Sequence, residues 1–241
     1  DVRLLTSPLQ ALELARSQPQ RQVVFLAVGF ETTAPATALL ARRALEEHCP
    51  NLSLLVAHVR VAPAMEAILT DPAHGVQGFL AAGHVCAVVG TAELERLVQR
   101  WTLPVVVCGF QPAELMEALL RCVAQLETGQ ARLENAYASV VRPEGNPVAR
   151  ALLEEVFVVV DQPWRGLGTL AGGGLALKGA YGHLDARRRF ELPGLTDGNP
   201  ADARKAGEPQ TPCIAGAILR GRALPSACAA FGTACTPDHP L

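Results

Sequence analysis

The sequence predicts an α/β protein with a doubly wound, mostly parallel sheet, followed by a Gly/Pro-rich C-terminal module. Two observations support this class. Short apolar runs of strand length alternate with amphipathic segments of helix length over the first 160 residues, which is the pattern of repeated βα units. After Trp164 the periodicity ends and glycines and prolines become frequent. We therefore expect an α/β core at residues 1–160 and a second module at residues 161–241.

The elements of the core follow from local signals. Ser7 and Pro8 precede a short amphipathic segment, and proline is common at the first position of a helix. The run Gln22–Val28 is nearly all apolar, which indicates a strand that a parallel sheet buries on both faces. The alternation then continues with predicted helices at 35–47, 64–69, 92–100 and 113–126, a short helix after Pro147, and predicted strands at 52–57, 76–81, 104–109 and 156–160.

Composition and charge exclude several classes of function. About half of the 241 residues are apolar and the formal net charge is −2, so a large core can form and no basic stripe is available for nucleic acid. The apolar runs are far shorter than the roughly 20 residues of a membrane-spanning helix. The first residues do not resemble a signal peptide. We expect a globular cytoplasmic protein that binds neither nucleic acid nor membrane.

Three loops that follow predicted strands combine a glycine with a polar side chain. They read GFETT at residues 29–33, AGHV at 82–85 and CGFQP at 108–112. Open α/β sheets bind ligands at the carboxyl ends of their strands, so these loops predict a crevice there. The candidate crevice residues are Glu31, Thr32, Thr33 and His84.

Each of these residues also has a simpler structural interpretation. A carboxylate with two hydroxyls can orient a ligand, but Thr32 or Thr33 can equally cap the following helix. His84 can ligate a metal or transfer protons near neutral pH, or it can be a hydrogen-bonded loop histidine. His58 and Arg60, which follow the next strand, either face the same crevice or belong to an ordinary polar surface.

The seven cysteines fall into two groups, and their odd number argues against a disulfide framework. Four stand in helical or apolar surroundings, where a free cysteine behaves as a small hydrophobic residue: Cys49, Cys86, Cys108 and Cys122. The other three lie close together among Gly, Pro and Ala: Cys213, Cys228 and Cys235. Thiolates on such loops can converge on an iron–sulfur cluster, with a fourth ligand from His239 or from outside the chain. Scattered structural cysteines are the alternative that spacing leaves open.

Four motifs in this order resemble those of the HypD family, the hydrogenase maturation or formation proteins. They are VFLAVGFETTAPATA at residues 24–38, GFLAAGHVCAVVG at 78–90, PVVVCGFQPAELM at 104–116, and the cysteine-containing tail between Asp202 and Pro240. The resemblance covers almost the whole chain. Four ordered motifs make a chance agreement improbable.

The resemblance implies a cytoplasmic scaffold that assembles the Fe(CN)2CO group of nickel–iron hydrogenase. Its partners would be a HypC-type chaperone, with which it holds the iron, and a HypE-type cyanide donor. A 4Fe–4S cluster would supply electrons, so the protein would be an assembly scaffold with a redox role rather than a conventional enzyme. On this basis the cluster ligands are Cys213, Cys228 and Cys235, and the crevice residues lie where iron, cyanide donor or partner meet.

The sequence also departs from the family pattern. It lacks the family's Cys-Pro-x-Cys segment and the cysteines that follow Cys-Thr-Pro. Ala215 stands where a second cysteine of a Cys-x-Cys pair is usual, and Gln77, Ala82 and Gln111 replace Asp, Pro and Glu. We therefore expect a chain truncated at both ends with an incomplete cluster site.

Two other functions stay open. One is a degenerate α/β binding module that keeps the fold and the partner surface without the cluster or iron-binding activity. The other is a small-molecule α/β enzyme, for which Glu31 or His84 would be the general base.

Overall fold

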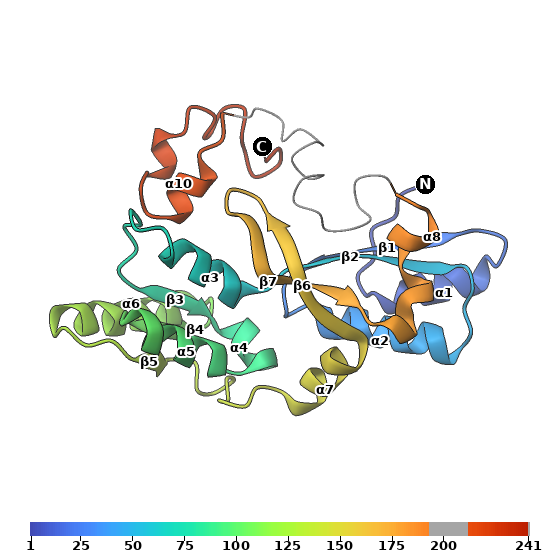
Figure 1. The fold of residues 1–241 in the computed structure, drawn as a ribbon, viewed down its shortest axis with the longest axis horizontal. Coiled ribbons are helices and arrows are strands. Elements are labelled where there is room, and N and C mark those ends of the chain that lie inside the picture. Colours follow the sequence, from blue (N-terminus) through green and yellow to red (C-terminus); the bar gives the residue numbers. More distant parts are fainter. Residues whose placement is uncertain (193–211, 241) are drawn as a thin grey trace.

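The computed structural model describes residues 1–192 and 212–240 of the chain (Figure 1). The first elements are α1 (Leu9–Ser17), β1 (Val23–Gly29), α2 (Ala34–Glu46), β2 (Leu52–His58), α3 (Val61–Leu69), β3 (Phe79–Ala82), α4 (Gly83–Val89), α5 (Ala92–Trp101), β4 (Val105–Cys108), α6 (Pro112–Glu127) and β5 (Leu133–Asn135). They are followed by α7 (Pro147–Val156), β6 (Phe157–Trp164), β7 (Gly168–Leu177), η1 (Gly179–Leu184), α8 (Ala186–Arg189), α10 (Ala215–Leu219) and η2 (Pro225–Ala227). This succession confirms the predicted α/β class.

Most of the strand pairing is parallel, and the described parallel strands divide between two sheets. β1 pairs with β2 along its whole length, from Val23 opposite Leu52 to Gly29 opposite His58. β4 lies between β3 and β5 in the second parallel sheet. β6 and β7 form a separate antiparallel hairpin with an irregularity at Val160. The carboxyl ends of β1, β3 and β4 carry the three glycine-containing loops.

The Gly-rich stretch that the sequence assigned to a C-terminal module contains a regular strand, β7. Its glycines allow close packing, because an added Cβ at Gly173 would lie 2.7 Å from Leu170 Cβ. The strand also contacts the core, since the Arg60 N–H donates to the Gly173 carbonyl at 2.9 Å. Periodicity does not reveal such a strand because glycine provides no apolar side chain. The predicted division between residues 160 and 161 falls inside β6.

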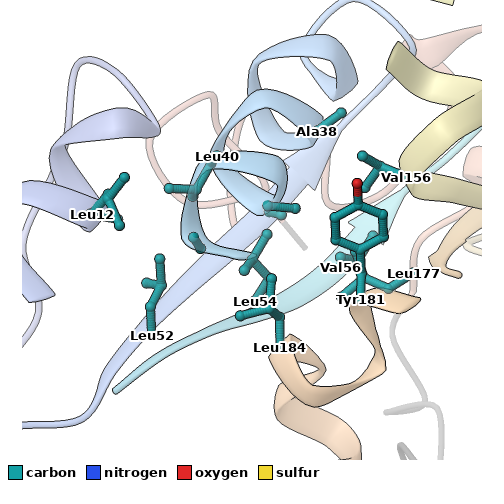
Figure 2. Close-up of a cluster of buried hydrophobic side chains, with 14 of the residues drawn as sticks. Leu12, Ala38, Leu40, Leu52, Leu54, Val56, Val156, Leu177, Tyr181 and Leu184 are labelled. Carbon is teal, nitrogen blue, oxygen red and sulfur yellow. The ribbon is translucent and has the colours of Figure 1, made fainter. Parts of the chain in front are cut away.

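The two larger of three hydrophobic clusters in the described residues support the two parallel sheets. The larger core packs α1 and α2 against β1 and β2, and Figure 2 shows Leu40, Leu52 and Leu54 facing one another in it. Tyr181 and Leu184 of η1 complete this core from far along the chain. The second core lies around β3 and β4, with α3 and α5 packed on it through residues such as Met65 and Leu97.

The prediction that β1 is buried on both faces is wrong for the part of the chain that the structure describes. Phe25 and Ala27 point into the core, whereas Val24, Leu26 and Val28 are 41%, 60% and 70% exposed. Alternate residues of a strand face opposite sides of a sheet, and no described element covers the second side. Within the described residues, no helix is long and apolar enough to cross a membrane.

Candidate functional site

The last residue of β1, Gly29, has no room for a side chain. Gly29 has a φ of +148°, and a Cβ added there would lie 2.2 Å from the Thr33 Oγ1 atom. The Thr33 hydroxyl donates to the Phe30 carbonyl at 3.2 Å. Gly29 therefore permits a tight turn that brings the polar residues of GFETT directly to the end of β1.

Glu31 is the buried member of this loop. Its side chain is 4% exposed, and Oε1 accepts a hydrogen bond from the Val61 backbone N–H at 3.0 Å. Val61 is the first residue of α3, so the carboxylate satisfies one of the N–H groups that a helix leaves unpaired at its start. The Oε2 atom has no hydrogen-bond partner among the described residues. Burial raises the pKa of Glu31 above its ordinary value of 4.5.

A small cavity lies beside Glu31. Its volume is about 20 Å³, which is enough for one water molecule. Its wall is mostly apolar and comes from β3, α3, α4 and α5, with Cys86 of α4 among the lining residues. Burial, and then the nearby Glu31 charge, raise the pKa of the Cys86 thiol to about 11. Cys86 is therefore a neutral thiol at ordinary pH and a poor nucleophile.

Arg60 connects this region to the β6–β7 hairpin. Its guanidinium donates to the Gly172 carbonyl at 2.8 Å and forms an ion pair with Glu93 of α5. The Arg60 side chain is 17% exposed, and its charge acts on Glu31, lowering that residue's pKa against the effect of burial. Arg60 is thus a partly buried link between three elements rather than an ordinary surface residue. The sequence left the role of Arg60 open because both partners, Gly172 and Glu93, are distant from it along the chain.

His58 and the two threonines occupy different environments. His58 is 1% exposed and shares a hydrogen bond of 3.0 Å with Thr37 Oγ1 inside the core, and burial lowers its pKa. Thr32 and Thr33 are exposed. Thr33 occupies the N-cap position of α2, but its side chain makes no capping hydrogen bond. The capping interpretation therefore fails for Thr33.

His84 lies at the end of β3, in the first turn of α4, and is exposed. Its ring stacks on Phe110 of the CGFQP loop, with centroids 4.9 Å apart and planes inclined by 17°. Tyr137 meets the same ring edge-on at 5.7 Å. The structure therefore joins His84 to the loop after β4. The residues that line the Glu31 cavity do not include His84, Thr32 or Thr33.

The C-terminal cysteines lie on a loop-rich segment around α10 and η2. Backbone N–H groups of Ile214 and Ala230 donate to the Cys228 sulfur and lower its pKa, and that sulfur lies 3.8 Å from the Pro212 carbonyl oxygen. Pro212 and Ile214, which both contact the Cys228 sulfur, are the chain neighbours of Cys213. The backbone of Cys213 therefore lies beside Cys228. The Cys235 N–H donates to the Ala230 carbonyl at 2.8 Å.

These cysteines fit an iron–sulfur cluster in chemistry but not in arrangement. Cys228 has the N–H donors that stabilise a thiolate ligand. In the two described ranges, however, no group of three or more His, Cys, Asp or Glu side chains is placed to hold a metal ion. The remaining cysteines, Cys49, Cys86, Cys108 and Cys122, are buried as predicted.

Two arginines of the cysteine segment, Arg220 and Arg222, form ion pairs with Asp71 in the loop after α3. Arg220 Nε lies 3.2 Å from Asp71 Oδ2, and its guanidinium donates to the Gly166 carbonyl at 2.9 Å. The Arg220 carbonyl accepts from the Gly75 N–H at 2.8 Å. Arg220 therefore positions the segment against both the loop after α3 and the turn of the β6–β7 hairpin, a contact that no sequence pattern indicated.

Comparison with known proteins identifies the family. The HypD family model, described as "Hydrogenase formation hypA family", matches residues 1–241. The chain is 40% identical over 242 residues to the hydrogenase maturation factor HypD of Rhodobacter capsulatus, and 40% identical over 246 residues to the hydrogenase expression/formation protein HupD of Azotobacter chroococcum. It is 38% identical over 248 residues to the HypD of Cupriavidus necator.

These alignments include all of this chain but 63%, 62% and 63% of the three relatives, respectively. The chain thus spans somewhat less than two thirds of the length of each relative. The family model nevertheless matches it from the first residue to the last. The chain belongs to the HypD family.

Proposed function

We propose that this chain acts in hydrogenase maturation as a scaffold of the HypD type. The observation that carries the proposal is the family match over residues 1–241. The names of the relatives, which call them hydrogenase maturation or formation proteins, give the process. The site geometry is consistent with a scaffold, because exposed threonines and an exposed histidine at the ends of β1 and β3 are accessible to a cargo or a partner.

The finer proposal concerns the cargo and the partners. With a HypC-type chaperone and a HypE-type cyanide donor, the protein would hold one iron while the Fe(CN)2CO group is assembled in the cytoplasm. The exposed loop residues Thr32, Thr33 and His84 would meet the cargo or a partner. The buried Glu31 would fix the shape of the loop, since its carboxylate joins the end of β1 to the start of α3.

The proposed resident cofactor is a 4Fe–4S cluster that supplies electrons. Its ligands in this chain would be Cys213, Cys228 and Cys235, and the hydrogen bonds to Cys228 favour the thiolate form that a ligand needs. The cysteine side chains would have to converge from their described positions. That requirement favours a second candidate, a binding module that keeps the partner surface without the cluster.

A chimera tests the maturation role. The 242-residue stretch of the Rhodobacter capsulatus relative that aligns with this chain would be replaced by the chain, and the product expressed in a strain without its own HypD. We expect restored hydrogenase activity, and reduced activity when Thr32 or His84 is changed to alanine. A chimera that folds and binds the HypC-type chaperone, yet gives no active hydrogenase, would support the binding-module candidate instead.

A further inference from the structure

Three neighbouring parallel strands each place one aromatic ring just beyond their carboxyl end. His84, Phe110 and Tyr137 are each the second residue after the end of β3, β4 and β5, respectively. The strands lie side by side in the order β3–β4–β5, and Ala82 at the end of β3 is opposite Cys108 at the end of β4. This register brings the three rings together at the edge of the sheet where open α/β proteins bind ligands.

The imidazole of His84 is contacted from two directions. Phe110 stacks on its face, with centroids 4.9 Å apart and planes inclined by 17°. Tyr137 approaches edge-on, at 5.7 Å and 63°. Both are favourable arrangements of aromatic rings. Phenylalanine has no hydrogen-bonding group, so the stack restricts the plane of the imidazole without engaging the ring nitrogens that can hydrogen-bond or bind a metal.

The glycines of the AGHV and CGFQP loops make room for Tyr137. A Cβ added at Gly83 would lie 2.6 Å from the Tyr137 Cδ1 atom and 2.5 Å from the Cys108 carbonyl oxygen. A Cβ added at Gly109 would lie 3.1 Å from the Tyr137 Cε2 atom and would also collide with the Glu114 carboxylate. Neither glycine has the positive φ that would itself favour glycine. Close packing is therefore the reason for glycine at both positions.

We propose that Phe110 and Tyr137 are positioning residues that hold the His84 imidazole in one orientation at the carboxyl edge of the β3–β4–β5 sheet. Functional side chains need neighbours that lock their rotamers, and a restrained ring loses less conformational freedom when a ligand binds. His84 is exposed, so the held ring can present a nitrogen outward. The inference rests on the proposed function only for the purpose of this orientation, which is contact with the cargo or a partner.

The first test measures the orientation and needs no maturation activity. The 241-residue chain, labelled with ¹³C in its histidine rings, would be studied by NMR, with His84→Asn identifying the His84 signals. We expect nuclear Overhauser effects from the His84 ring to Phe110 and Tyr137, and ring-carbon relaxation that shows a rigid ring. Phe110→Leu should make the ring mobile and move its proton signals downfield, because the shielding face of the phenyl ring is lost. Phe110→Tyr should preserve the rigid ring.

Matched variants separate positioning from general destabilisation. Phe110 is 62% exposed, so Phe110→Leu should leave the fold intact, which circular dichroism checks. Phe190→Leu makes the same exchange at a phenylalanine that is 39% exposed at the end of α8, and it should leave the His84 signals unchanged. Tyr137→Leu should mobilise the ring, whereas Tyr137→Phe keeps the edge contact and should not. A His84 ring whose mobility is the same in the unchanged chain and in Phe110→Leu would overturn the proposal.

The second test asks whether the orientation serves maturation. In the Rhodobacter capsulatus chimera, Phe110→Leu is expected to lower hydrogenase activity about tenfold, the lower end of the loss when a residue that orients a histidine ligand is removed. Phe110→Tyr should retain the activity. Impaired maturation with His84→Ala but full maturation with Phe110→Leu would also overturn the positioning role. A chimera that matures no hydrogenase at all would reject the proposed function, and the NMR comparison would then decide the positioning by itself.

Discussion

Glu31 Oε1 accepts a hydrogen bond from the Val61 N–H at 3.0 Å, which ties the end of β1 to the first turn of α3. The two residues are 30 positions apart in the chain. This contact makes the most distinctive motif of the sequence, GFETT, part of the framework as well as part of the candidate site. It also gives Glu31 a role that can be separated from any contact with cargo or partner.

We expect Glu31→Ala to be less stable than Glu31→Gln by about 1 kcal/mol, the usual contribution of one hydrogen bond. Glutamine keeps an acceptor for the Val61 N–H, whereas alanine leaves that N–H without one. Urea unfolding of both variants measures the difference. Equal stabilities would show that the hydrogen bond contributes nothing to the folded state.

The pKa of Glu31 predicts a specific pH dependence. Burial raises this pKa above 4.5, so the folded protein holds the proton more tightly than the unfolded chain does. The resulting stabilisation is fully present below pH 4.5 and is lost as pH rises through the higher folded pKa. The unfolding free energy of the unchanged chain, minus that of Glu31→Gln, should therefore fall as pH increases from about 4.5. A difference that rises over the same range would contradict the assignment.

Arg60→Ala is expected to destabilise the protein by about 1–3 kcal/mol, because it removes charged hydrogen bonds to Glu93 and to the Gly172 carbonyl. Arg96→Ala is the matched control. The Arg96 side chain is 68% exposed and its guanidinium lies 3.9 Å from the same Glu93, so its loss should cost about 0–1 kcal/mol. Chemical unfolding of both variants provides the comparison, and equal losses would argue against a linking role for Arg60.

The thiols should differ in their rates of alkylation. Hydrogen bonds lower the pKa of the partly exposed Cys228, whereas Cys86 is 3% exposed with a pKa of about 11. Iodoacetamide should therefore modify Cys228 long before Cys86 in the folded chain, because the thiolate is the reactive form. Peptide mass spectrometry at timed intervals gives both rates. Early labelling of Cys86 would mean that α4 opens readily.

The cluster proposal predicts a contrast among cysteines. In a version of the protein extended past Leu241 and reconstituted anaerobically with iron and sulfide, Cys213→Ser, Cys228→Ser and Cys235→Ser should each remove most of the visible absorbance and iron. Cys49→Ser and Cys122→Ser should leave both largely unchanged, because these two thiols are buried. The 241-residue chain itself should bind a cluster poorly. A full, air-tolerant cluster in the short chain would contradict an incomplete site and would require a ligand such as His239.

The order of helices and strands in the core was predictable, because hydrophobic periodicity is a local property. The predicted segments Gln22–Val28 and Ala113–Leu126 correspond to β1 and α6. Several elements were not predicted, and for two of them the reason is identifiable. The Gly-rich β7 lacks the side chains that reveal a strand, and α4 begins directly after β3 without an intervening polar stretch.

The sequence by itself determined the α/β class, the family, the buried state of four cysteines and the placement of polar loops after strands. Only the tertiary structure decided which polar groups meet: Glu31 with Val61, Arg60 with Glu93, and His84 with Phe110. The physical reason is that burial follows from the pattern of neighbouring residues, whereas a hydrogen bond or a ring stack depends on how distant segments pack. The same reason explains why only the structure shows that Glu31 lines a small cavity whose lining residues do not include His84.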